Sequence, residues 1–290
     1  MAALRDIKIK IKAIKKIEQI TRAMSMVASA KLRNTQGKME RFSPYARKFE
    51  EIMGNLAGRI DPDVHPLLMK REGVTNVELL HFSSDKGLCG SFNMNNIALC
   101  EKWVNEQREK QTGYKLNLIG RKGREYFTKR GFNISSSHIH VYGNVNISFV
   151  NKMTQDFISK YMNGEINELY MVYSRFINLS KQIPTLVKLI PVEPPKAEKD
   201  SGEASNEYLC EPGIKELLAV LLPKHISVQI MNAFFQNEVS EYAARMAAMD
   251  NAKKNCKDMV KELTLTFNKA RQAAITAELM DIVGGAEAIS

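Results

Sequence analysis

The sequence predicts an α/β fold that combines a long antiparallel coiled coil of the N- and C-terminal helices with a Rossmann-like three-layer α/β domain. Apolar residues recur at spacings of three and four from Val239 to Ala274, and a similar stripe begins at Leu4. Such repeats are typical of helices in a coiled coil. Between these ends, residues 74–192 alternate strand-like and helical segments, which indicates an α/β domain.

Residues 3–39 are predicted to form the first helix. The segment contains no proline, and its first glycine is Gly37. Its apolar stripe consists of Leu4, Ile7, Ile11, Ile14, Ile17, Ile20, Met24, Val27 and Leu32. Such a stripe has to be buried against a partner, and we expect the C-terminal helix to be that partner. Ser43-Pro44 is expected to kink or end the first helix, because proline removes a helical hydrogen bond.

Residues 74–192 are predicted to form a largely parallel sheet covered by helices. The expected strands are residues 74–83, 114–119, 132–141, 166–176 and 181–192, and the expected helices are residues 92–111, 121–130 and 147–162. The last two strands follow each other through a turn near Asn178. This pair suggests an antiparallel edge on the sheet.

A linker is expected at residues 193–207, where Pro194-Pro195 is followed by mostly charged and small residues. Such a composition favours local disorder. The chain is therefore expected to consist of a coiled-coil helix (1–58), an α/β domain (59–192), the linker (193–207) and a second coiled-coil helix (208–290).

The C-terminal region is predicted to be one long helix. Proline does not occur after Pro223, and glycine does not occur between Gly213 and Gly284. A helix over residues 224–283 would be about 90 Å long, whereas a compact domain made of this chain would be only about 40 Å across. We expect it to extend beyond the domain, and we expect Pro223 to kink or restart it. Its stripe consists of Val239, Tyr242, Met246, Met249, Lys253, Cys256, Val260, Leu263, Phe267, Ala270 and Ala274.

The seam between the two helices is expected to include three residues of each. In the first helix these are Ile11, Ile14 and Ile20. In the last helix they are Val260, Leu263 and Phe267.

The net charge of +10 is concentrated at the N-terminus, where residues 1–41 hold eleven Lys or Arg and three acidic residues. This excess suggests an acidic partner, which could be a protein, a membrane surface or nucleic acid. Nucleic acid is disfavoured because the helix lacks a base-reading set and interleaved aromatic residues. A membrane-surface helix is disfavoured because its apolar side carries no Trp or Phe. We expect no membrane span, signal peptide or transit peptide.

The turn at residues 83–90 is the best candidate for a phosphate-binding loop, because it follows a predicted strand and contains Gly87 and Gly90. Backbone N–H groups at such junctions bind phosphates. The segment matches neither GxGxxG nor GxxxxGK[ST], the two fingerprints of nucleotide loops. We therefore interpret it as a glycine-shaped turn that packs or contacts a partner, and we predict no cofactor.

No catalytic or metal-binding residue is predicted. His138 and His140 share one face of a predicted strand, but no cysteine or carboxylate cluster accompanies them. A nucleophilic role for a cysteine would need a base, and none is identifiable near Cys89. The scattered cysteines suggest reduced thiols; they are Cys89, Cys100, Cys210 and Cys256.

The end of the last helix allows two interpretations. The side chains along its stripe become small, at Ala270, Ala273, Ala274 and Ala277, and Asp281 interrupts the heptad. The segment could be a frayed terminus. It could equally be a helix end held in an apolar collar of another protein, where small side chains fit closely.

Several segments resemble the gamma chain family of rotary ATP synthases. They are QITRAMSMVA at residues 19–28, SDKGLCGSFN at 84–93, YLCEP at 208–212, NKARQA at 268–273 and ITAELMDIVGGAEA at 275–288. The last of these matches the family's C-terminal signature. The segments occur in the family's order and cover both chain ends.

The resemblance implies a non-catalytic rotor subunit in the central stalk of a proton-translocating ATP synthase. In this family the coiled coil runs up a ring of alternating alpha and beta subunits, and the α/β domain lies beside epsilon and on the membrane ring of c subunits. The turning c ring drives the shaft, while nucleotide chemistry stays at the alpha–beta interfaces. We therefore expect these subunits as partners, no nucleic acid, and a peripheral location on the cytoplasmic side of a bacterial inner membrane.

Matching positions imply two sets of contacts. Contacts with the beta subunit are implied for Arg271, Gln272 and Thr276 and, in the first helix, for Arg22, Met24 and Lys31. Contacts of the foot with the c ring or epsilon are implied for Tyr208, Cys210 and Glu211. Cys210 departs from the pattern, which favours an aromatic residue, and the paired-cysteine insertion of chloroplast forms is absent.

The alternative function is that of a non-rotating coiled-coil adaptor or scaffold. An enzyme with its own nucleotide site is disfavoured, because the chain has no phosphate-binding motif.

Overall fold

The computed structural model describes residues 2–57, 64–71, 73–143, 145–193 and 213–287. The chain divides into two compact units: the terminal unit (Met1–Ala30 with Arg245–Ser290) and the α/β unit (Lys31–Ala244). Two long helices belong to both, α1 (Ala2–Ala57) and α5 (Ile214–Glu287). The linker expected at residues 193–207 lies almost wholly outside the described residues.

Of the kink or end expected at Pro44 and the kink or restart expected at Pro223, the end and the restart do not occur. Pro44 lies inside α1 and Pro223 inside α5. A proline inside a helix leaves the carbonyl four residues earlier without its usual donor. These carbonyls belong to Glu40 and Ala219, both of which are exposed, so water can take the missing place.

The α/β unit contains a five-stranded sheet in the order β3-β2-β1-β4-β5. The strands are β1 (Asn76–Phe82), β2 (Gly113–Ile119), β3 (Ile134–His138), β4 (Glu168–Asn178) and β5 (Lys181–Ile190). The first four run parallel, and β5 pairs antiparallel with β4. The predicted parallel sheet with an antiparallel edge is therefore confirmed.

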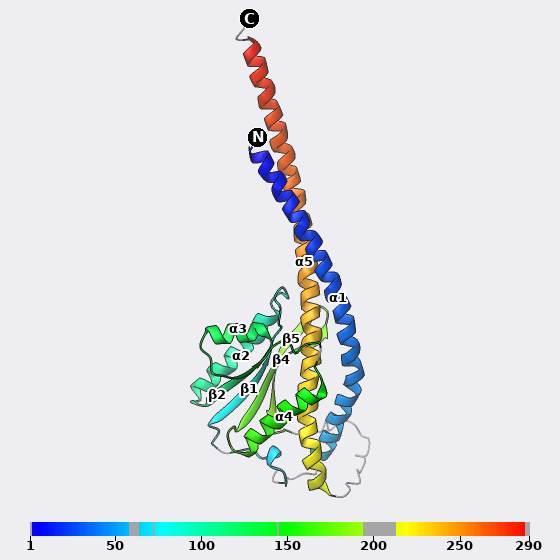
Figure 1. The fold of residues 1–290 in the computed structure, drawn as a ribbon, viewed down its shortest axis with the longest axis vertical. Helices are drawn as coiled ribbons and strands as arrows, with labels where there is room; N and C mark the ends of the chain where they lie inside the picture. The colour runs from blue at the N-terminus through cyan, green and yellow to red at the C-terminus, as the bar shows by residue number, and fades with distance from the viewer. Residues whose placement is uncertain (1, 58–63, 72, 144, 194–212, 288–290) are drawn as a thin grey trace. The chain divides into compact units, whose positions relative to one another are not determined.

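Helices cover both faces of this sheet (Figure 1). One face packs against α2 (Phe92–Glu109) and α3 (Arg121–Lys129), and the other packs against α4 (Ile147–Met162) and α5. A short 3-10 helix, η2 (Pro66–Leu68), which the sequence analysis did not expect, packs with the second group. Alternation along β1 supplies both cores, with Leu79 toward α2 and α3 and Leu80 toward α4 and α5.

One helix in the described part of the chain, α5, contains an 18-residue window apolar enough to cross a membrane, and 56% of that window is buried. The core helix of a folded domain passes the same test of length and composition. In α5 the apolar residues that pack on the sheet include Leu218, Leu222, Ile226 and Ile230. The apolarity of this window is therefore accounted for by the core of the α/β unit.

His81 in β1 is a buried titratable group that packs between the sheet and α3. Its ring lies 5.2 Å from the ring of Phe127 in an edge-on arrangement. The neighbouring helix residue is Gly123, where an added Cβ would come within 2.8 Å of the His81 Nδ1. Burial lowers the pKa of His81 to about 3, because the charged imidazolium is poorly solvated in the core.

This buried histidine should make the fold sensitive to acid. In the unfolded chain the imidazole takes up a proton below its ordinary pKa of 6.5, whereas in the folded chain it stays neutral down to a pKa of about 3. Unfolding therefore becomes more favourable as the pH falls through this window, by up to about 1.4 kcal/mol per pH unit. In urea unfolding at pH 7 and pH 5, His81→Leu should lose less stability between the two values than the wild type.

His140→Asn is the matched control, because the His140 side chain is 69% exposed. His81→Leu should reduce the dependence of the unfolding free energy on pH more than His140→Asn does. If His81→Leu keeps the wild-type dependence, the acid sensitivity does not come from His81.

Candidate functional site: the paired terminal helices and the loop after β1

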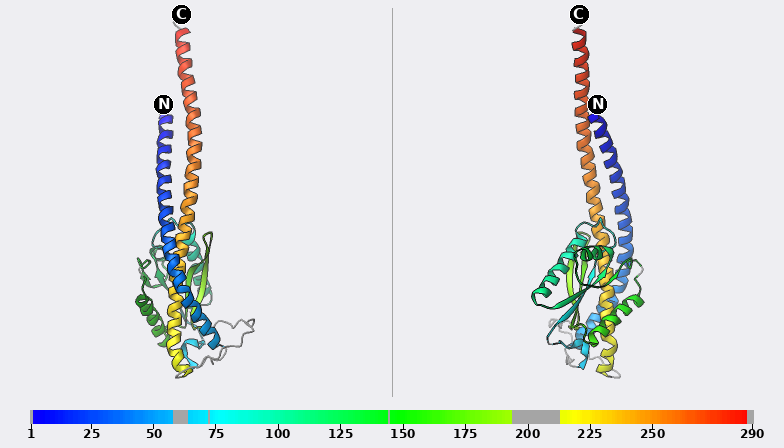
Figure 2. Two further views of the ribbon diagram at one scale, coloured as in Figure 1. Left: turned by 90° about the vertical axis from the view of Figure 1, so that its right-hand side faces the viewer. Right: turned by 60° about the vertical axis from the view of Figure 1, so that its left-hand side comes forward.

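In the terminal unit α1 and α5 lie side by side and antiparallel, as both figures show (Figures 1 and 2). The Ser25 hydroxyl donates a hydrogen bond to Asp250 Oδ1 at 2.9 Å. Ser25 and Ala28 of α1 are buried, as are Met249 and Cys256 of α5. The two helices are therefore in contact through side chains of both.

The seam on the α5 side follows the apolar stripe of the sequence. Beyond Cys256, its members Val260, Leu263, Phe267, Ala270 and Ala274 are all half-buried, whereas their neighbours are exposed. From Ile275 to Val283 every described side chain is exposed. The seam therefore ends at Ala274, although α5 stays helical to Glu287.

The seam on the α1 side differs from the predicted stripe after Ile14. The least exposed positions keep an unbroken alternation of three and four residues: Leu4, Ile7, Ile11, Ile14, Glu18, Thr21, Ser25 and Ala28. Ile11 and Ile14 belong to this series. Ile20 does not, because its side chain is 58% exposed. The predicted stripe was drawn through the apolar residues. In the structure the seam keeps the heptad period instead, and small or polar residues occupy it after Ile14.

A second apolar stripe results on the outside of α1. Ile17, Ile20 and Val27 are 50–58% exposed, and Met24 between them is half-buried. Their spacing of three and four residues puts them on one side of the helix. We call these four residues the outer stripe. All four belong to the apolar stripe that was read from the sequence, where they were expected to face α5.

The other predicted contact residues are placed as follows. Arg271, Gln272 and Thr276 are exposed on the last turns of α5, where the Thr276 hydroxyl donates to the Gln272 carbonyl at 3.0 Å. Arg22 is exposed beside the outer stripe. Lys31 belongs to the α/β unit, and its Nζ lies 5.6 Å from the ring centre of Tyr242. The foot residues Tyr208, Cys210 and Glu211 lie outside the described residues.

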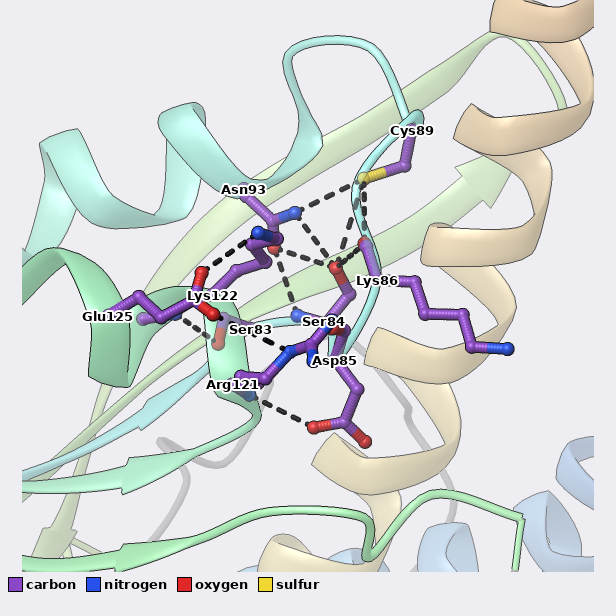
Figure 3. A network of polar contacts seen from close by, with 10 residues as sticks. Ser83, Ser84, Asp85, Lys86, Cys89, Asn93, Arg121, Lys122 and Glu125 are labelled. Carbon is purple, nitrogen blue, oxygen red and sulfur yellow. Dashed lines mark hydrogen bonds and ion pairs between the residues drawn. The ribbon is translucent and has the colours of Figure 1, made fainter.

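The loop after β1 is held by a network of hydrogen bonds (Figure 3). The Ser84 hydroxyl donates to the Lys86 carbonyl at 2.6 Å. Asn93 Oδ1 accepts from the Ser84 N–H at 2.9 Å, and Asn93 Nδ2 lies 3.2 Å from the Cys89 sulfur. Cys89 is buried, so its thiol is part of the packing of this turn.

The same loop caps the first turn of α3. The N–H of Arg121 donates to Asp85 Oδ1 at 2.9 Å, that of Lys122 to the Ser84 carbonyl at 3.0 Å, and that of Gly123 to the Ser83 hydroxyl at 2.8 Å. These amides belong to the first turn of α3, whereas the helix that directly follows the loop is α2. The loop is therefore packed against the start of α3, which supports the interpretation of a structural turn.

The two histidines of β3 and its following turn do not converge on a ligand site. His138 packs edge-on against Phe149 at 5.4 Å, and burial lowers its pKa. His140 is largely exposed, and its backbone N–H donates to Asp85 Oδ2 at 3.1 Å. In the described ranges, no group of three or more His, Cys, Asp or Glu residues is arranged to hold a metal ion.

Known proteins identify the family. The family model described as ATP synthase matches residues 3–289. The chain is 46% identical over 290 residues to the ATP synthase gamma chain of Syntrophobacter fumaroxidans, a match that covers 100% of this chain and 99% of that one. It is 43% identical over 289 residues to the gamma chain of Nitratidesulfovibrio vulgaris, with the same coverage. The chain belongs to the ATP synthase gamma chain family. The resemblance seen in the sequence is therefore confirmed, and as a gamma chain it is a non-catalytic subunit of ATP synthase.

Solved structures share its fold. One is the Euglena gracilis mitochondrial ATP synthase described as OSCP, F1 and c-ring in rotational state 3, which matches with a TM-score of 0.67 at 22% identity, covering 99% of this chain and 95% of that chain. Another is the rotor of the same enzyme in rotational state 1, with a TM-score of 0.63 at 21% identity, covering 94% and 99%. These matches confirm the predicted fold class.

The seam predicts that Phe267→Asp weakens the pairing of α1 and α5. An aspartate at this half-buried position has to keep its charge beside apolar side chains, which should cost about 2 kcal/mol. The helix signal of the full-length chain should melt earlier in thermal unfolding followed by circular dichroism. Leu265→Asp is the matched control, since Leu265 is 63% exposed. Equal melting of the two variants would contradict the assignment of Phe267 to the seam.

Proposed function

We propose that this chain is the central-stalk rotor of a proton-translocating ATP synthase, and that it transmits torque between the membrane c ring and the ring of alpha and beta subunits. The observation that carries the proposal is the end of α5. It remains helical to Glu287, yet its apolar side chains Ile275, Leu279, Met280 and Ile282 are 49–68% exposed. A continuous helix argues against a frayed end. Such an apolar surface fits a collar in a partner protein.

Contacts with the beta subunit are proposed on two exposed surfaces of the terminal unit. Arg271, Gln272 and Thr276 lie on the part of α5 beyond the seam, where a guanidinium can make charge-assisted hydrogen bonds to a partner loop. Met24 belongs to the outer stripe, and Arg22 lies beside it. An apolar stripe edged by basic residues suits a partner that offers both an apolar and an acidic surface.

Lys31 and the basic N-terminal segment extend this proposed contact. Residues 1–41 hold eleven Lys or Arg and three acidic residues. Attraction between exposed charges is screened by salt and depends little on exact geometry. It is therefore suited to contacts that break and form again during rotation.

The membrane side of the assembly is proposed from family membership. Tyr208, Cys210 and Glu211 would contact the c ring or epsilon at the foot of the stalk. The chain would then be peripheral, on the cytoplasmic side of a bacterial inner membrane. The complex of a related enzyme is described as containing F1 and the c-ring, which supports partners of this kind.

Removal of residues 271–290 tests the rotor function. The truncated chain keeps the seam up to Ala270 but loses the exposed end of α5. Assembled with alpha and beta subunits, it should produce less torque in single-molecule rotation, and the complete complex in vesicles should make ATP several-fold more slowly. Lys261→Ala is the control, because Lys261 is 79% exposed on the paired part of α5. A non-rotating adaptor would leave torque and ATP synthesis unchanged by the truncation.

A further inference from the structure

β4 is longer than its parallel neighbour, so part of its backbone has no strand beside it. β1 pairs with β4 only as far as Val172, opposite His81. β4 continues to Asn178 and pairs there with β5 on its other side. Ser174 lies in this extension and is only 2% exposed. Buried backbone N–H and C=O groups need hydrogen-bond partners.

Side chains of α5 take the place of the missing strand. The Ser174 N–H donates to Asn237 Oδ1 at 3.2 Å, and the Ser240 hydroxyl donates to the Ser174 carbonyl at 3.0 Å. The Phe176 N–H donates to Gln236 Oε1 at 2.9 Å. One short stretch of α5 therefore satisfies three backbone groups on one side of β4.

Asn237 joins further elements to the same point. Its Nδ2 donates to the Tyr142 hydroxyl at 2.9 Å. Its Oδ1 accepts a second hydrogen bond from Asn96 Nδ2 at 3.3 Å, and that same nitrogen lies 3.2 Å from the carbonyl of Phe82 at the end of β1. Asn96 and Asn237 are both 0% exposed. A single buried amide therefore links α5 with α2, β4 and the turn after β3.

These hydrogen bonds restrict rotation of α5 about its axis, which the surrounding apolar contacts do not. Ile230 and Phe234 of α5 pack into the core next to Asn237, but apolar burial is non-directional. It resists separation of the helix from the sheet and tolerates a small rotation of the helix about its axis. A hydrogen bond weakens steeply when its geometry is lost, and a buried group left without its partner is costly.

We propose that Gln236, Asn237 and Ser240 form a joint, here called the β4 joint, that fixes the rotational position of α5 on the sheet and carries torque between them. Asn237 is its central positioning residue. The torque-bearing part of this inference rests on the rotor function proposed above. The positional part depends only on the α/β unit.

Amide hydrogen exchange tests the positional part in the full-length chain. Asn237→Leu removes the acceptor of the Ser174 N–H, and Gln236→Ala removes that of the Phe176 N–H. Each amide should exchange at least ten-fold faster in its variant, while the Val172 amide, inside the β1 pairing, should not change. Gln229→Ala is the matched control, because the Gln229 side chain also lies on α5 but donates to the exposed Glu50 at 3.1 Å. In this variant the Ser174 and Phe176 amides should exchange as in the wild type.

A measurement of torsional stiffness tests whether the β4 joint carries torque. In the assembled complex, with the alpha and beta ring fixed and a probe on the α/β unit, the angular variance of the probe should at least double in Asn237→Leu. Ser240→Ala removes one hydroxyl and little volume, so it should widen the variance in a chain that folds normally. Gln229→Ala should give the wild-type variance.

The outcomes separate this inference from the rotor function. Faster exchange together with a wider variance supports the β4 joint. Unchanged exchange at Ser174 and Phe176, or unchanged variance in both Asn237→Leu and Ser240→Ala, overturns it. Failure of the rotor function would instead be seen when loss of residues 271–290 leaves torque intact, a change that does not touch these amides.

Discussion

The antiparallel pairing of α1 and α5 along one heptad stripe is the constraint on which the rest of the structure depends. The terminal unit consists of segments of these two helices alone. A helix is only marginally stable alone in water, and in a protein most of its stability comes from the burial of one face. α5 is also continuous from Ile214 to Glu287, so the residues of the seam and those of the α/β core belong to one hydrogen-bonded helix.

Because small residues occupy the seam, the larger apolar residues of α1 are available to contact a partner. Where the heptad reaches Thr21, Ser25 and Ala28, small side chains face α5, and the Ser25–Asp250 hydrogen bond replaces apolar packing. The larger apolar residues at this level form the outer stripe instead. A helix with two stripes can stay paired with α5 through one and offer the other to a partner.

Much of the fold could be predicted from the sequence, because its signals are local. The predicted helix at residues 147–162 coincides with α4 (Ile147–Met162), and the strands of the sheet agree within a few residues. Alternation, helical periodicity and turn residues act over short distances in the chain. Pro44 and Pro223 were expected to kink or interrupt their helices, and both helices continue through them. The proline alone does not decide between a kink and an interruption.

The candidate sites were harder to predict, because they depend on residues far apart in sequence. Ile20 lies outside the seam although it is apolar, since the heptad period and not the residue type decides which side faces α5. The bond from Ser174 to Asn237 joins residues 63 positions apart. Nothing in the pattern near Asn237 indicates that its amide replaces a strand. The end of α5 was visible in the sequence as a change to small residues, and its continued helical structure supports the proposed collar.

The central claim, that the two chain ends form one antiparallel pair, is tested most directly by a distance between them. Spin labels on unnatural amino acids at the exposed positions Lys15 and Lys261 should give one narrow distance within about 25 Å, because the axes of packed helices lie about 8–10 Å apart. A label moved from Lys261 to Leu279 should lie roughly 25 Å farther along the helix. A broad distribution for the first pair, or one centred beyond about 40 Å, would contradict the pairing and the rotor built on it.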